Sequence, residues 1–239
     1  MATSSRVVLL SGPEIDTEAV MRFRLTYSGE LRPSGREPDA QQPDPLALHK
    51  HKLRQAFHVQ LKQLWATNKF LREHELDPRA IRAARPVGDD RTYWSSGGRR
   101  APMSEIVADQ YKEFGYRFLP LVREDISLLC SLKILFLRRD IPGSVISAGD
   151  IDNRIKTIID GLRRPRNGKE VLGNEVPKEG EDPFFVLLED DKLVTHLEVE
   201  TDTLLDPPTG GNFDHRLVHL VITVELRPYN VTLFNLSFS

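Results

Sequence analysis

Residues 149–162 read GDIDNRIKTIIDGL, and two patterns separate when this stretch is placed on a helical wheel of 3.6 residues per turn. One arc of the wheel is apolar and predicts a face that packs against a core; it holds Ile151, Ile155, Ile158, Ile159 and Leu162. Asp152, Lys156 and Asp160 are spaced four apart and form a neighbouring polar stripe. Asp150 stands where a helix N-cap residue would. The stretch therefore predicts a helix from about 150 to 164 that presents carboxylates and an amine at the edge of its buried face.

Apolar runs on both sides of this helix predict a sheet. Strands of alternating or continuous apolar residues are expected at 20–27, 116–122, 128–137, 184–188, 194–199 and 217–226. Apolar residues at helical spacing predict one long amphipathic helix over 46–76. The expected fold is α/β of the α+β type, a mixed β-sheet packed with helices. We expect a single domain over 1–239 with loop insertions near 77–110 and 163–183, and a flexible N-terminus at 1–17.

The composition limits the functional class. The chain has 239 residues, with 33 basic and 35 acidic side chains and a formal net charge of -2, so any surface that binds nucleic acid must be local. Cys130 is the single cysteine, which excludes an intrachain disulfide or a thiolate metal cluster and predicts a buried, inert thiol. The start of the sequence lacks a signal-peptide pattern, and no run approaches the ~20 apolar residues of a membrane span. We expect a cytoplasmic protein without a membrane partner.

Three basic segments are candidates for phosphate contact. The first begins within the predicted helix and continues past its end. It contains Arg154, Arg163, Arg164, Arg166 and Lys169. The second is the run at 49–54, and the third combines Tyr93 and Trp94 with GGRR at 97–100. A solvated face or an ordinary surface loop is the alternative in each case.

A second acidic group follows an apolar strand in VLLEDDKLV, residues 186–194. If the strand end delivers Glu189, Asp190 and Asp191 toward the helix start, a bound cation would offset their mutual repulsion, and oxygen ligands suit Mg²⁺ or Mn²⁺. Such an ion activates water and polarises a phosphodiester. The alternatives are an N-cap at Asp150, ordinary i, i+4 ion pairs along the helix and an exposed acidic turn.

This arrangement resembles the RusA family of Holliday junction resolvases. The hallmark of that family is a helix that opens with D-x-D-N, followed by Lys and Asp at helical spacing and by a D-D pair near the next strand. The matching residues are Asp150, Asp152, Asn153, Lys156, Asp160, Asp190 and Asp191. The order of strands and helices also agrees, so the resemblance spans roughly residues 18–228.

The resemblance implies a RusA-like homodimer that uses Mg²⁺, with Mn²⁺ as the alternative, to cleave branched DNA such as Holliday junctions in recombination and repair. It implies that Asp150, Asp152 and Asp191 are catalytic and bind the metal, that Asp190 supports them, and that Lys156 is essential beside them. Asp160 would be a supporting residue and Asn153 would shape the helix start.

The chain also departs from the family. It is longer and slightly acidic, and the basic residues that usually precede the first Asp stand upstream at Arg138 and Arg139. Two other functions therefore stay open. One is a non-catalytic module that binds nucleic acid or protein, and the other is a metal enzyme acting on a smaller phosphate substrate. The sequence does not decide between DNA and RNA.

Overall fold

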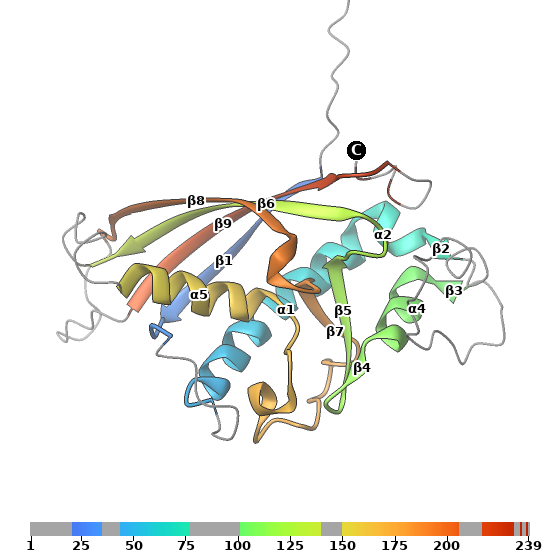
Figure 1. Cartoon of the computed structure of the whole chain (residues 1–239), viewed down its shortest axis with the longest axis horizontal. Helices are drawn as coiled ribbons and strands as arrows, with labels where there is room; N and C mark the ends of the chain where they lie inside the picture. The colour runs from blue at the N-terminus through green and yellow to red at the C-terminus, as the bar shows by residue number, and fades with distance from the viewer. Residues whose placement is uncertain are drawn as a thin grey trace, which may run out of the picture.

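The computed structural model of the chain describes residues 21–34, 44–76, 101–139, 150–205 and 217–231, with Asn235 and Phe238. Its strands are β1 (Arg22–Glu30), β2 (Glu75–Leu76), β3 (Ala101–Pro102), β4 (Lys112–Glu113), β5 (Tyr116–Val122), β6 (Leu128–Arg138), β7 (Phe184–Leu188), β8 (Val194–Thr203) and β9 (Leu217–Pro228). Its α-helices are α1 (Ala47–Thr67), α2 (Lys69–Glu73), α4 (Met103–Gln110) and α5 (Asp150–Leu162), and its 3₁₀ helices are η1 (Gly168–Val171) and η2 (Asp191–Leu193). The mixed α and β content confirms the expected fold class (Figure 1).

The larger sheet has four strands in the order β1-β9-β6-β8. Strands β1, β9 and β6 are antiparallel neighbours, and β8 runs parallel to β6 at the edge. Residues of β6 alternate between buried and partly exposed, as expected for a sheet that packs on one face. The helices α1 and α5 lie on that buried side (Figure 1).

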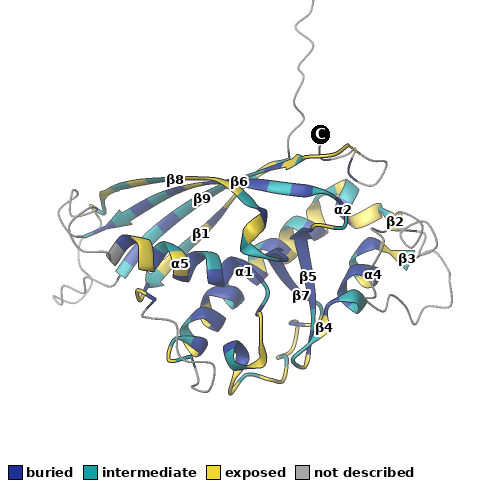
Figure 2. Cartoon of the chain, viewed as in Figure 1, coloured by how far each residue is buried: buried dark blue, intermediate teal, exposed yellow. Residues whose placement is uncertain are grey.

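The smaller sheet has the order β4-β5-β7, and its strands β5 and β7 are parallel. Every residue of β7 is buried, and Figure 2 shows β5 and β7 as the most deeply buried strands of this region. The packing of α1 against β7 includes a hydrogen bond in which the backbone N–H of Phe185 donates to His58 Nδ1 at 2.9 Å. The two parallel strands therefore end together inside the protein, and the acidic residues follow β7 directly.

Helices α1 and α5 cross closely because α5 has a glycine at the crossing. A Cβ atom at Gly161 would lie 2.8 Å from the Cβ atom of Leu53 on α1. Both Leu53 and Leu162 are fully buried. The C-terminal half of α5 is therefore fixed against α1. This packing makes α5 a rigid support for the side chains at its two ends.

The expected strands are present at β1 and at β5 to β9, with bounds that differ by a few residues. The single helix expected over 46–76 is wrong, because Asn68 is extended with φ -72° and ψ 119° and separates α1 from α2. The Asn68 side chain then caps α2 by accepting the N–H of Leu71. The capping preference of Asn68 thus outweighs the helical spacing of apolar residues that continues past it.

Parts of the expected insertions are ordered elements of the domain. Residues 101–110 form β3 and α4, and α4 buries Ile106 and Val107 in the core. The segment 163–183 contains η1, which packs against α1. Residues 77–100, with Tyr93, Trp94 and the GGRR segment, lie outside the described residues, as does the expected N-terminal segment 1–17. Among the described helices, none is both long and apolar enough to span a membrane.

Candidate functional site

The first acidic group stands at the start of α5. Asp152, Asn153 and Lys156 are exposed, while the structure describes only the backbone of Asp150. The carbonyl of Asn153 accepts hydrogen bonds from the backbone N–H and the hydroxyl of Ser34, both at 3.0 Å. The helix start is therefore fastened to the segment after β1, while the carboxylate of Asp152 remains open to solvent.

The second acidic group stands where β7 ends. The backbone N–H of Glu189 donates to the carbonyl of Val122 at 3.0 Å, and its carboxylate accepts the N–H of Glu124 at 3.0 Å. Asp190 caps η2 by accepting the N–H of Lys192 at 3.0 Å. Burial tends to raise the pKa of Asp190, but the Lys192 N–H and the Arg166 charge hold it below its ordinary value. Glu189 is thus fixed to the smaller sheet, and Asp190 is held as a carboxylate.

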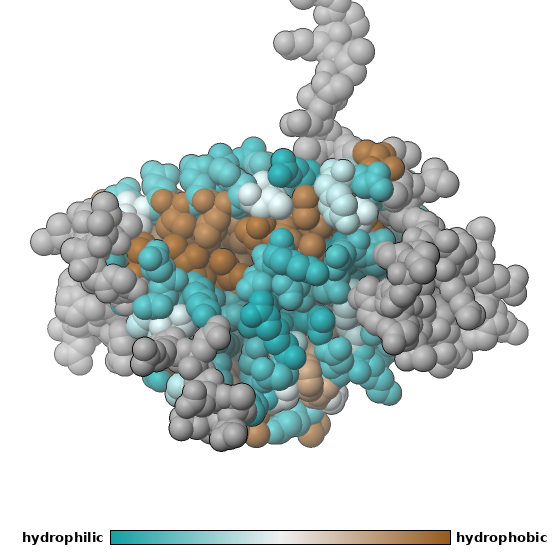
Figure 3. Space-filling view, in the orientation of Figure 1, coloured by the Kyte–Doolittle hydropathy of each residue, from teal (hydrophilic) through white to brown (hydrophobic). Residues whose placement is uncertain are grey.

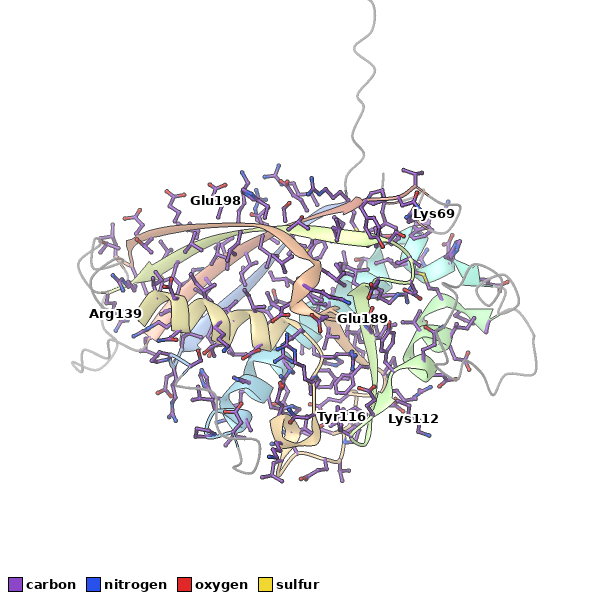
Figure 4. The ribbon with its side chains drawn as sticks, in the orientation of Figure 1. Lys69, Lys112, Tyr116, Arg139, Glu189 and Glu198 are labelled. Atoms are coloured by element: carbon purple, nitrogen blue, oxygen red, sulfur yellow. The ribbon has the colours of Figure 1, made fainter. Side chains whose placement is uncertain are left out.

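The two acidic groups lie at opposite ends of α5. Arg163 forms a β-bridge with Leu188, and the N–H of Arg164 donates to the carbonyl of Leu188 at 3.0 Å, so β7 ends beside the C-terminal end of the helix. Figure 4 shows Glu189 at this end and Arg139 at the other. An α-helix rises about 17 Å between positions such as Asp152 and Arg163, at about 1.5 Å per residue.

The prediction that one chain holds a metal ion between the two acidic groups is therefore corrected. Cations such as Mg²⁺ need their oxygen ligands within about 2.6 Å, far less than the length of α5. In the described part of the chain, no three side chains of the metal-binding types come together around a common point. The carboxylate chemistry of each group suits Mg²⁺ or Mn²⁺, but each group by itself offers only part of a coordination shell.

A buried ion network occupies the C-terminal half of α5. Its members come from α1, α5 and η1 and from the residues beside them; they are Asp44, Lys50, Arg54, Asp160, Arg163 and Glu170. Asp160 contacts Lys50 at 2.7 Å and Arg163 at 2.5 Å. Burial alone would raise the pKa of Asp160, but these two cations outweigh it and hold the pKa below its ordinary value. Asp160 is therefore a structural residue that fixes α5 to α1, not a member of a metal site.

Arg54 is the most enclosed member of the network, with 1% of its surface exposed. Its guanidinium forms an ion pair with Glu170 and donates to the carbonyls of Arg163 at 3.1 Å and Glu170 at 3.3 Å. Arg163 in turn contacts the second carboxylate oxygen of Glu170 at 3.1 Å. Every charge of the network faces an opposite charge, which is the condition for burying charges stably.

The burial of this network corrects the assignment of several basic residues. Arg154 and Arg163 are buried, so they are not placed for phosphate contact. Lys50 and Arg54 are buried too, so the run at 49–54 is neither simply a solvated face nor a phosphate-binding one. Among the basic residues after α5, Arg166 is exposed and Arg164 and Lys169 are partly exposed. Arg164 contacts Glu113 at 2.6 Å and stacks over Tyr111.

His51 adds a pH-dependent element beside this network. It is 2% exposed, and burial, aided by the charge of Arg54, lowers its pKa from 6.5 to about 4. A histidine whose pKa is depressed on folding stabilises the fold fully above its unfolded pKa, and this stability is lost as the pH falls through the folded pKa. We expect the free energy of unfolding to fall between pH 6.5 and 4, and His51→Gln to reduce that dependence.

Urea unfolding of the wild type and of His51→Gln at several pH values between 7 and 4 measures this effect. His196→Gln is the matched control because His196 lies on the exposed strand β8. Carboxylates also titrate in this range, and burial lowers the pKa of His58 as well, so the difference between wild type and variant is the quantity to follow. A difference that stays constant with pH would contradict the assignment.

An apolar surface lies between α5 and β8, made by Ile155, Ile159, Leu197 and Val199. Leu197 is 41% exposed, and the other three are partly exposed. Leu197 and Val199 pair in register with the buried Leu132 and Ile134, so they share the face that packs on the helices. Figure 3 shows this apolar surface below β8. The expectation that Ile155 and Ile159 are covered by the core is therefore wrong for the single chain, and we call these four residues the α5–β8 surface.

The buried role of Lys50, Arg54 and Glu170 was not predicted from the sequence. A signal was present, since Lys50 and Arg54 are four apart and continue the apolar stripe of Phe57 and Leu61 toward the helix start. A charged residue on the buried stripe of a helix requires a buried partner of opposite charge.

Comparisons with protein-family models, with curated proteins and with solved structures give no match to this chain.

Proposed function

We propose that this chain is a divalent-metal-dependent endonuclease for branched DNA, and that two copies of the chain together complete each catalytic site. The observation that carries the proposal is the placement of carboxylates that are exposed at one end of α5 (Asp152) and partly exposed at the other (Asp190 and Asp191), with the partly exposed α5–β8 surface beside that helix. The RusA resemblance supplies the reaction class. The separation of the acidic groups within one chain supplies the requirement for a second copy.

A two-fold axis across α5 would produce this arrangement. Two copies of α5 packed antiparallel would place the start of each helix beside the end of the other, because a symmetric interface brings the same surface of both copies together. Asp150 and Asp152 would then lie near Asp190 and Asp191 of the partner subunit. The two half-sites are one helix length apart in each copy, so a single axis would complete both sites at once.

The α5–β8 surface supports helix packing over pairing of two β8 strands in the register centred on Val199. Antiparallel pairing of β8 with its own copy, centred on Val199, would place Glu198 opposite Glu200 twice. Like charges directly opposite each other destabilise a sheet. Contact through Ile155 and Ile159 of α5 buries apolar area without this repulsion.

The residues would divide the chemistry between them. When bound, a dication supplies Lewis-acid polarisation and lowers the pKa of an attacking water. Asp152 of one copy and Asp191 of the partner subunit would supply oxygen ligands. Lys156 is exposed one turn after Asp152 and would place a positive charge beside the developing charge on the phosphate.

The experiment that tests this function is a panel of labelled substrates incubated with Mg²⁺ and with Mn²⁺. The panel contains a four-way junction, a flap, linear duplexes, single strands and the corresponding RNA structures. We expect cuts near the branch point of DNA junctions, no cuts after chelation of the metal, and none with Asp152→Asn. If no substrate is cut with either ion, the enzyme proposal fails.

One observation favours a second candidate, a module that binds nucleic acid without cutting it. The burial of Arg154 and Arg163 leaves fewer cations for phosphate than the sequence indicated, in a chain of net charge -2. The same panel separates the candidates, because stable complexes with intact substrates in the presence of metal would support the module.

A further inference from the structure

Arg166 contacts both aspartates of the second acidic group. Its guanidinium lies 2.5 Å from Asp191 Oδ1 and 3.9 Å from Asp190 Oδ1. The side chains of Arg166 and Asp191 are 48% and 38% exposed, respectively. A cation that takes up Asp191 as a ligand must therefore compete with this guanidinium.

We propose that Arg166 is an exchangeable cation, which a divalent metal ion displaces from Asp191 and which then becomes available to a phosphate of the bound nucleic acid. The proposal rests on the proposed function and names a device that regulates the same site. The proposal links metal binding at Asp191 to phosphate contact by Arg166, because the arriving metal ion replaces the charge of Arg166 and repels its guanidinium.

The surroundings of Arg166 allow the side chain to move while the backbone stays in place. Its backbone N–H donates to Glu170 at 3.3 Å, and Glu170 belongs to the buried ion network. The chain before it is held by the hydrogen bond between the Arg164 N–H and the Leu188 carbonyl. The side chain alone extends into solvent, so its displacement requires no unfolding of the loop.

The strength of the contact suits an exchange. Ion pairs exposed to this degree change an equilibrium constant by no more than about fivefold, so a dication can displace the guanidinium at a modest loss of affinity. A buried pair such as that of Arg54 and Glu170 would not exchange in this way, because an uncompensated charge would be left in the interior. The two arginine–carboxylate pairs of this region thus have different roles, one exchangeable and one permanent.

The first test measures Mn²⁺ affinity by titration followed with electron paramagnetic resonance, which requires no catalysis. We expect Arg166→Gln to bind Mn²⁺ about two- to fivefold more tightly than the wild type, because the competing ion pair is gone. Lys169→Gln removes the same charge from the same loop and is the matched control. It should change the affinity far less, and Arg166→Lys should fall between the wild type and Arg166→Gln.

The second test measures binding of a labelled four-way junction at several salt concentrations, with and without Ca²⁺, while the substrate is checked to be intact. With the cation, the salt slope of Arg166→Gln should be smaller than that of the wild type by about one phosphate contact. Without the cation, the two proteins should have the same slope, because Arg166 is engaged by Asp191.

The outcomes separate the two proposals. Measurable but equal Mn²⁺ affinity in the wild type and in Arg166→Gln would overturn the exchange and leave the proposed function standing. Equal salt slopes in the presence of Ca²⁺ would overturn the phosphate step. Absence of Mn²⁺ binding in all four proteins would overturn the metal site, and the exchange with it.

Discussion

Replacing Arg54 by methionine is expected to lower the free energy of unfolding by about 3–5 kcal/mol, which is typical when one partner of a buried ion pair is removed. Arg54 is 1% exposed, and its guanidinium satisfies Glu170 and two backbone carbonyls. Methionine fills a similar volume but leaves the network with one excess negative charge and the carbonyls without their donor. Urea unfolding followed by circular dichroism at pH 7 measures the loss.

Two further variants identify the cause of that loss. Arg72→Met removes an arginine from a pair with Glu73 whose side chains are 54% and 50% exposed, and it should cost no more than about 1 kcal/mol. The double variant Arg54→Met with Glu170→Gln restores the charge balance and should be less destabilised than the sum of its single changes. A loss below about 1 kcal/mol for Arg54→Met would contradict the structural role of the network.

The sheet was predictable because its strands carry their pattern locally. The alternation along β6 and the continuous apolar run of β7 follow from burial on one face and on both faces, respectively. The break at Asn68 and the ordered helix α4 were not predicted, since they depend on a cap and on packing against distant elements. Local patterns determined the larger elements, and tertiary contacts determined the interruptions.

The sequence indicated which elements carry the acidic residues of the candidate site, but not how those elements are arranged. Asp152, Asp190 and Asp191 are at least partly exposed, as a site requires, and the acidic pair follows the strand as expected. The sequence does not show which end of α5 that strand reaches. The answer depends on the bridge between Arg163 and Leu188, a contact between backbones that no side-chain pattern marks.

The sequence also did not predict which of the basic residues are buried and which are exposed. Arg163 and Arg166 are three apart in a polar segment and have the same side chain, so sequence alone treats them alike. Arg163 points into the interior, where Asp160 and Glu170 balance it, whereas Arg166 is nearly half exposed beside Asp191. Asp160 on the last turn of α5 and Glu170 on η1 are both buried beside Arg163, whereas Arg166 lies past the end of the helix beside the partly exposed Asp191. The burial of the two acids arises from the packing of α5 and η1 against α1, which the sequence around the two arginines does not show.

Mixing two inactive variants is expected to restore cutting if two copies complete each site. Asp152→Asn and Asp191→Asn should each reduce junction nicking by about a hundredfold or more, since each would remove a ligand of the proposed catalytic ion. After subunit exchange, half of the dimers contain one copy of each variant. Such a dimer has one site that lacks both aspartates and one that lacks neither. Nicking should therefore recover to about a quarter of the wild-type rate.

The matched control is the double variant Asp152→Asn with Asp191→Asn, mixed with Asp191→Asn. No dimer in that mixture has an intact site, so its nicking should stay at the level of the single variants. Initial nicking rates of a labelled four-way junction, measured after incubation long enough for exchange, provide the comparison. A catalytic site built within one chain would give no recovery in either mixture, because every chain carries a defect. Recovery in the first mixture alone would place Asp152 and Asp191 of each working site on different copies, as the opposite ends of α5 require.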